Sequence, residues 1–129
     1  MKIVQTPVGH MEVFCYLVYD EASDEGILID PAGDEDRLLD LLREHGVRLR
    51  YIVNTHGHPD HTCGNGTLRA NTGARIVMHA LDDDFFQTRE AQQWAAMMGF
   101  TPSPPADLRV HDGSELSFGS ITLTFLHTP

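Results

Sequence analysis

Short apolar runs alternate with helical patterns along the chain, and together they predict a sheet covered by helices. The clearest helix is expected at Asp34–His45, because leucines recur at helical spacing and acidic residues fill the first turn. Asp34 is placed to cap this helix, and Gly46 follows its last turn. Further helices are expected at Gly66–Thr72 and over most of Leu81–Met98.

Strands are predicted where runs of β-branched and aromatic residues are bounded by turn residues. These runs are Lys2–Thr6, Met11–Tyr19, Gly26–Asp30, Leu49–Val53, Arg75–Met78, Leu108–Val110, Leu116–Phe118 and Ile121–Leu126. The Pro-rich segment Phe100–Pro105 is expected to be a loop. Because strands alternate with helices through the middle of the chain, we expect one α/β (or α+β) domain over residues 1–129.

Composition narrows the class of protein and of partner. The 129 residues are 41% hydrophobic and 22% charged, which is typical of a globular domain. The formal charge of −10 argues against binding to nucleic acid or to an anionic membrane, since both require clustered Lys and Arg. Two cysteines, Cys15 and Cys63, are too few for a disulfide framework. With no signal-peptide pattern and no long apolar run, we expect a cytoplasmic protein.

One polar segment, THGHPDHTCG, contains three histidines and one aspartate within six positions directly after a predicted strand. Imidazole and carboxylate groups are the usual ligands of Zn²⁺, and also of Fe²⁺ or Mn²⁺. In an extended loop alternate side chains point the same way, so His56 and His58 can converge on one ion. Asp60 and His61 lie beyond Pro59, which stiffens the turn and lets them reach a second ion. The sequence therefore predicts a metal centre here.

Several other residues have less distinctive explanations. Cys63 is expected to be buried rather than to bind metal, and His79 to cap a helix or strand. The acidic run Asp82–Asp84 is expected to be the solvated start of a helix. Small Gly57 and Gly64 would let the backbone crowd near a metal. The apolar residues Trp94, Met97, Met98 and Phe100 are expected to pack in the core, with the rim of a substrate entrance as the alternative.

The motif HGHPDH resembles the H-x-H-x-D-H signature of the metallo-β-lactamase fold hydrolases, and of their small glyoxalase-II-like group in particular. The segments ILIDPAGDEDRLLDLL, ARIVMHALD and PPADLRVHDGSELSFGSITLTFLHTP resemble that family in the same order. This resemblance implies that His56 and His58 bind one zinc ion, and that Asp60 and His61 bind a second. Asp60 would also orient or deprotonate the attacking water, and Asp30 would hold the metal loop through hydrogen bonds.

The resemblance also implies an activity. A metal-bound hydroxide would attack the carbonyl of a small thioester or ester, as in hydroxyacylglutathione hydrolases. One alternative within the fold is an iron-dependent persulfide dioxygenase, which uses a similar cluster of ligands. An alternative of another class is a non-catalytic metal-binding or assembly module, which would be favoured if the gene ends at residue 129.

The family's third motif is similar to HTPGH, whereas this sequence stops at His127-Thr128-Pro129, before the final histidine. We therefore expect the N-terminal half of an αββα sandwich, with a mixed sheet that has helices on one face. Each metal would then have two protein ligands, where a catalytic zinc usually has three, so weak activity is expected. The other face of the sheet would be exposed, and we expect it to favour a homodimer.

Overall fold

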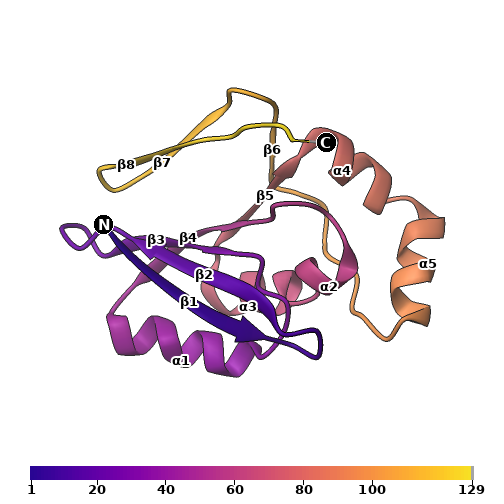
Figure 1. Ribbon diagram of the computed structural model, residues 1–129, viewed down its shortest axis with the longest axis horizontal. Coiled ribbons are helices and arrows are strands. Elements are labelled where there is room, and N and C mark those ends of the chain that lie inside the picture. Colours follow the sequence, from indigo (N-terminus) through magenta and orange to yellow (C-terminus); the bar gives the residue numbers. More distant parts are fainter. Residues whose placement is uncertain (129) are drawn as a thin grey trace.

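The computed structural model describes residues 1–128. A mixed six-stranded sheet lies at its centre (Figure 1). Its strands are β1 (Lys2–Val8), β2 (Val13–Tyr19), β3 (Glu25–Ile29), β4 (Arg48–Val53), β5 (Arg75–His79) and β6 (Leu108–Val110), in that spatial order. Strands β1, β2 and β3 pair antiparallel, and β3 to β6 pair parallel. The predicted mixed α/β sheet is confirmed.

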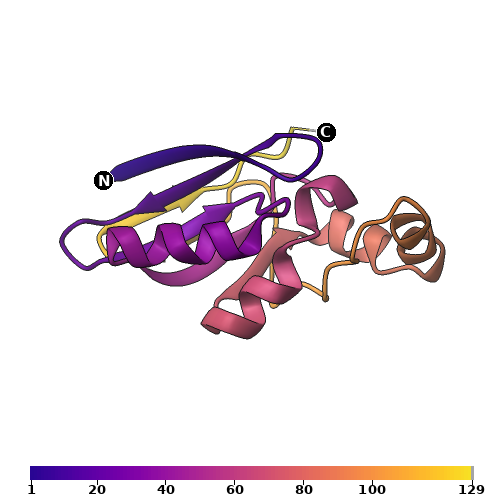
Figure 2. The same ribbon diagram turned by 90° about the horizontal axis from the view of Figure 1, so that it is seen from below.

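Two helices, α1 (Glu35–His45) and α3 (Asn65–Thr72), cover one face of this sheet (Figure 2). Their buried leucines Leu38 and Leu68 are fully shielded from solvent in one cluster with sheet residues Leu28, Ile52 and Ile76. Burial of apolar side chains is the main source of stability in such a layer. The remaining helices are α2 (Pro59–Thr62), α4 (Ala80–Phe86) and α5 (Arg89–Met97). No helix within residues 1–128 has the length and apolar character needed to cross a bilayer.

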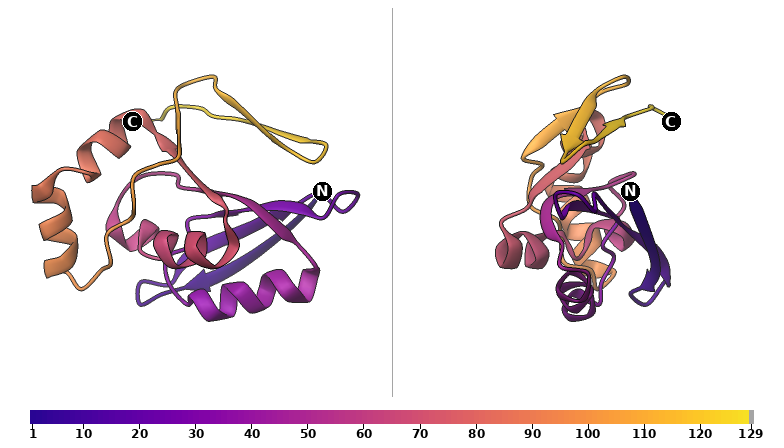
Figure 3. Two further views of the ribbon diagram at one scale, coloured as in Figure 1. Left: turned by 180° about the vertical axis from the view of Figure 1, so that it is seen from behind. Right: turned by 90° about the vertical axis from the view of Figure 1, so that its left-hand side faces the viewer.

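A separate hairpin, β7 (Glu115–Phe118) and β8 (Ile121–Thr124), lies over the opposite face of the sheet (Figure 3). Phe118 and Leu116 are buried there in one cluster with Val18, Ile27 and Val53. Polar contacts from Asp20 hold the turn of the hairpin. The result is three layers: helices, the six-stranded sheet and the hairpin. The expectation that the second face of the sheet is exposed was therefore wrong where the hairpin covers it.

The carboxylate of Asp20, which follows β2, anchors the turn of the hairpin. It accepts hydrogen bonds of 2.8 Å from the backbone N–H of Ser120 and 2.9 Å from its hydroxyl. Ser23 Oγ donates a third bond of 3.1 Å to the same oxygen. These bonds hold the pKa of Asp20 at about 2, below its usual value of 3.8, because they stabilise the ionised carboxylate. An ionised side chain thus links segments 100 positions apart.

The structure differs from the predicted elements at three places. The helix predicted over most of Leu81–Met98 is two helices, because Thr88 adopts an extended backbone and caps α5 by accepting from Ala91 N–H. The metal segment, predicted as a loop, contains the helical turn α2. Asp34 precedes α1 as expected, but its carboxylate accepts from Gly9 N–H at 2.9 Å and makes no capping bond.

Strand ends also shift by a few residues. β1 continues through Pro7 to Val8, which is possible because β1 is an edge strand and needs no N–H donor on its open side. β8 ends at Thr124, two residues earlier than predicted. The four parallel strands end at the same edge of the sheet, where α/β sheets commonly bind ligands.

Candidate metal centre

The segment that carries the predicted ligands leaves β4 at Asn54 and enters α3 at Asn65. These two buried amides bond each other, with Asn65 Nδ2 donating to Asn54 Oδ1 at 2.7 Å and the reverse bond at 3.3 Å. Between them, Gly64 N–H donates to the Pro31 carbonyl at 3.0 Å. Both ends of the segment are therefore fixed to the sheet. The pairing of Asn54 with Asn65 was missed from sequence, because nothing local marks the two amides as partners.

Asp30, buried at the end of β3, is the centre of the hydrogen-bond network under this segment. Its Oδ1 accepts from Thr55 N–H at 2.8 Å. Its Oδ2 accepts from the Thr55 hydroxyl and lies 3.1 Å from Nδ1 of His61. Asp30 therefore links the start of the segment to α2.

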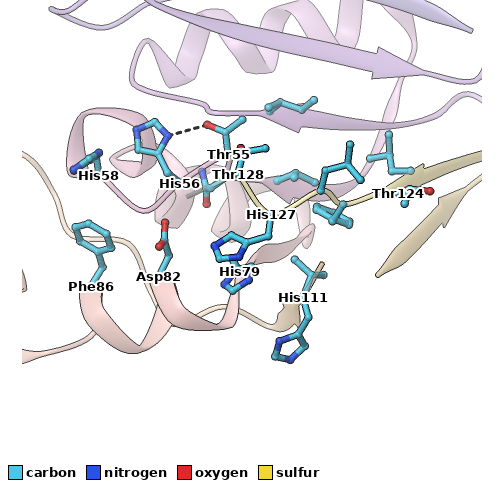
Figure 4. A pocket seen from close by; sticks show the side chains of 17 residues that line it. Thr55, His56, His58, His79, Asp82, Phe86, His111, Thr124, His127 and Thr128 are labelled. Atoms are coloured by element: carbon cyan, nitrogen blue, oxygen red, sulfur yellow. Dashed lines mark hydrogen bonds between the residues drawn. The ribbon is translucent and has the colours of Figure 1, made fainter. Parts of the chain in front are cut away.

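The same network sets which ring nitrogens face outward. Because Asp30 is an acceptor, Nδ1 of His61 carries the proton and Nε2 keeps its lone pair. The Thr55 hydroxyl, which donates to Asp30, lies 3.0 Å from Nδ1 of His56, so its oxygen accepts a hydrogen bond from the Nδ1–H (Figure 4). Nε2 is therefore the nitrogen that is free to bind an ion on both His56 and His61.

The predicted ligands lie close together. The ring centroid of His56 is 4.1 Å from that of His61 and 4.8 Å from that of His58. An oxygen of Asp60 lies 3.8 Å from Nε2 of His61. Within residues 1–128, however, the group whose ligating atoms all lie within 4.8 Å of one another is Asp30, His56 and His61, which is not the predicted pairing.

Asp30 is unsuited to be the third ligand of that group, because hydrogen bonds from Thr55 and His61 already engage both of its oxygens. The donor set of three imidazoles and the Asp60 carboxylate suits zinc or iron. Burial and the neighbouring His61 lower the pKa of His56, which favours the neutral imidazole that metals require. Metal ligation by His56, His58, Asp60 and His61 stays a prediction.

A pocket of about 650 Å³ opens beside His56 and His58 (Figure 4). One wall comes from the ends of β3 to β6 and the other from the segment after β8. His127 stacks on His79 there, with ring centroids 4.2 Å apart and an interplanar angle of 23°. His79 also accepts from Leu81 N–H at 3.1 Å, so its predicted capping role is confirmed.

The prediction of a solvated Asp82–Asp84 run was wrong for two of its members. Asp82 lines the pocket and accepts a hydrogen bond of 2.8 Å from Gly57 N–H. Asp83 is buried and accepts from Ala106 N–H at 2.9 Å. Both bonds join residues more than 20 positions apart, so the local acidic pattern could not reveal them.

The two glycines of the segment are required by neighbouring protein atoms. A Cβ on Gly57 would overlap the Phe86 ring, and a Cβ on Gly64 would overlap the Pro31 carbonyl. These protein contacts are enough to require glycine at both positions, and the expectation that they also make room for a metal stays a prediction.

Two further expectations concerned side-chain burial. Cys63 is only half-buried, whereas Cys15 is fully buried, and burial raises the pKa of the Cys15 thiol to about 12. The prediction that the apolar stretch packs in the core was wrong for Trp94, Met97 and Met98, whose side chains are exposed. They lie on or just after α5, which projects from the sheet edge (Figure 1).

Most of the chain matches the model of one protein family. The model described as the metallo-beta-lactamase superfamily matches residues 8–129. The chain belongs to this superfamily. The superfamily's members include metal-dependent hydrolases and related enzymes.

Similar curated superfamily members have two different activities. The chain is 30% identical over 129 residues to the hydroxyacylglutathione hydrolase of Methylococcus capsulatus, with 100% of this chain and 43% of that protein covered. It is 34% identical over 118 residues to the mitochondrial persulfide dioxygenase ETHE1 of Homo sapiens, with 90% and 39% covered. The chain thus spans about two fifths of the length of these relatives.

Solved structures agree on the metallo-beta-lactamase fold. The B3 metallo-beta-lactamase BLEG-1 superposes with a TM-score of 0.86 at 24% identity, covering 99% of this chain and 62% of that one. TTHA1623, solved in a di-iron-bound form, gives a TM-score of 0.74 at 26% identity, covering 88% and 56%. The first likeness is evidence of fold alone because its sequence identity is low.

Proposed function

We propose that this chain carries the metal-binding part of a superfamily hydrolase that cleaves a small thioester or ester. The observation that carries the proposal is the network from Asp30, which leaves Nε2 of both His56 and His61 free, while His56 and His58 line a pocket. A pocket of about 650 Å³ has the size of a small-molecule site. Thioester chemistry is supported by the similarity to hydroxyacylglutathione hydrolases.

In this proposal His56 and His58 hold one metal, and Asp60 and His61 hold a second. Zinc is the proposed metal, with iron or manganese as alternatives. A bound divalent metal lowers the pKa of its water and stabilises the oxyanion that forms on a carbonyl. Asp60 is half-buried beside His61, so its carboxylate can orient the attacking water and accept its proton. Asp30 keeps the two imidazoles in the required tautomer.

Metal binding is the first test. Titration calorimetry of the 129-residue chain with Zn²⁺ should give binding that His58→Ala weakens at least tenfold. His10→Ala is the matched control, because this histidine is exposed and lies outside the motif. Equal zinc affinity in the two variants would overturn the ligand assignment.

Hydrolysis is the second test. The zinc-loaded chain should cleave an S-(2-hydroxyacyl)glutathione slowly, since each proposed metal has two of the usual three protein ligands. EDTA should abolish this cleavage. Zinc binding without any cleavage would instead favour the non-catalytic metal-binding module.

A persulfide dioxygenase is the second candidate, and the similarity to the human enzyme favours it. It would bind one iron ion and consume O₂ when given a small-molecule persulfide. Metal analysis after purification, followed by an oxygen-electrode assay with iron-loaded protein, separates the two candidates.

A further inference from the structure

Apolar side chains gather on the surface of the α4–α5 helical pair. Leu81, Phe85, Trp94, Met97 and Met98 have exposed fractions between 43% and 86%. Phe85 and Trp94 line one hollow of this surface, and contiguous exposed apolar surface is typical of a binding site. The helical pair lies beyond the edge of the sheet, so no other layer of the structure covers it (Figures 1 and 3).

Part of this surface is hollowed into a groove of about 370 Å³. Phe85, Phe86, Ala91 and Trp94 line it together with His58, and Glu90 is its one charged residue. A volume of a few hundred Å³ suits a ligand fragment, which is much smaller than a protein interface. The lining favours a neutral apolar group, because a negatively charged group would face the Glu90 carboxylate.

The groove lies next to the pocket beside the candidate metal centre, and two side chains separate the two hollows. His58 and Phe86 line both the groove and the 650 Å³ pocket. The His58 ring packs edge-on against Phe86 with ring centroids 5.6 Å apart, and Figure 4 shows the two side chains next to each other. A molecule whose reacting carbonyl lies near His58 can therefore extend an attached chain into the groove.

We propose that the groove formed by Phe85, Phe86, Ala91 and Trp94 binds the apolar acyl or aromatic group of the substrate. This inference rests on the proposed function and narrows its substrate class to thioesters or esters with an extended apolar group. Phe85 and Trp94 are then specificity-determining residues, because their exposed faces become buried when the group binds.

Binding can be measured without turnover, because Trp94 is the single tryptophan of the chain and its fluorescence reports on the groove. The 129-residue chain is titrated in EDTA with S-octanoyl-N-acetylcysteamine and with the S-acetyl analogue. The octanoyl probe should shift Trp94 emission to shorter wavelength with saturation. It should bind at least about tenfold more tightly than the acetyl probe, since each buried methylene contributes a factor of up to about four.

Phe85→Ala should weaken octanoyl binding about tenfold. Phe14→Ala is the matched control, because Phe14 is 54% exposed, similar to 61% for Phe85, and lies on β2 outside the groove. Equal binding of the two probes, or equal effects of the two variants, would overturn the inference. An emission shift that follows protein concentration instead of probe would also overturn it, and would identify a second copy of the chain as the occupant. If the groove fails these tests but the zinc-loaded protein still cleaves the acetyl probe, the proposed hydrolase function is supported and only the role of the groove is overturned.

Discussion

The carboxylate of Asp82 accepts a hydrogen bond of 2.8 Å from the backbone N–H of Gly57, the residue between His56 and His58. Helix α4 therefore fixes the backbone of the metal segment between two predicted ligands. Asp30 fixes the same segment through Thr55 and His61. Two carboxylates from different elements thus position the candidate ligands.

Replacing Asp82 should weaken metal binding more than it weakens the fold. Asp82→Ala should lower zinc affinity about tenfold, because the Gly57 N–H loses its acceptor and the adjacent histidines lose their position. Asp82→Asn keeps an acceptor oxygen and should bind zinc nearly as the parent does. Calorimetry provides the measurement, with Asp84→Ala as control because Asp84 is exposed and pairs with Arg109. The same affinity in Asp82→Ala and Asp84→Ala would refute this positioning role.

Replacing Asp30 should lower the free energy of unfolding even when no metal is bound. Asp30→Ala removes the acceptor of three donors, from Thr55 and His61, in a buried position. The free energy of unfolding should fall by about 2–4 kcal/mol in urea titrations of the metal-free protein. Asp36→Ala, in the exposed first turn of α1, should change it by less than about 0.5 kcal/mol. Comparable losses in both variants would contradict this account.

The contact of Gly57 with Phe86 predicts a compensating pair of substitutions. Gly57→Ala should destabilise the protein by about 1–3 kcal/mol, because the added methyl overlaps the Phe86 ring. Adding Phe86→Ala should recover part of this loss, which a double-mutant cycle would measure as a coupling free energy. Gly66→Ala is the control, since a Cβ there makes only ordinary contact with Pro104. Strictly additive effects at positions 57 and 86 would show that the overlap is relieved elsewhere.

The lowered pKa of Asp20 predicts a pH-dependent contribution to stability. A depressed pKa in the folded state stabilises the fold above the unfolded value near 3.8, and this stabilisation is lost as pH falls towards about 2. Asp20→Asn should therefore lower Tm by roughly 5 °C at pH 7, and the difference should shrink between about pH 4 and pH 2. Circular dichroism melts at several pH values give the comparison. Asp24→Asn, exposed in the same turn, should melt close to the parent at every pH.

Local pattern was sufficient to predict the strands of the sheet and the segment in which the histidines gather. Strands such as Leu49–Val53 are marked by apolar runs with turn residues at their ends, and the HGHPDH motif lies within one short segment of the sequence. The break at Thr88 also had a local signal, since Thr followed by an acidic first turn is a typical helix start. In such cases neighbouring residues decide the conformation.

The residues that support the site could not be predicted in this way. Asn54 pairs with Asn65, Asp82 with Gly57 and Asp20 with Ser120 only because the fold brings them together. Exposure of Trp94 was missed for the same reason, because an apolar stretch does not say whether its helix packs on the sheet or projects from it.

The anchoring of the hairpin by Asp20 also has a consequence for biosynthesis. Ser120 follows Asp20 by 100 residues, so at about 5–20 residues per second it is made roughly 5–20 s later. Once Val53 has been made, the sheet face formed by Val18, Ile27 and Val53 has no hairpin to cover it for the rest of that interval. The nascent chain therefore exposes an apolar sheet face for seconds, which is long enough for chaperones to bind it before β7 and β8 emerge.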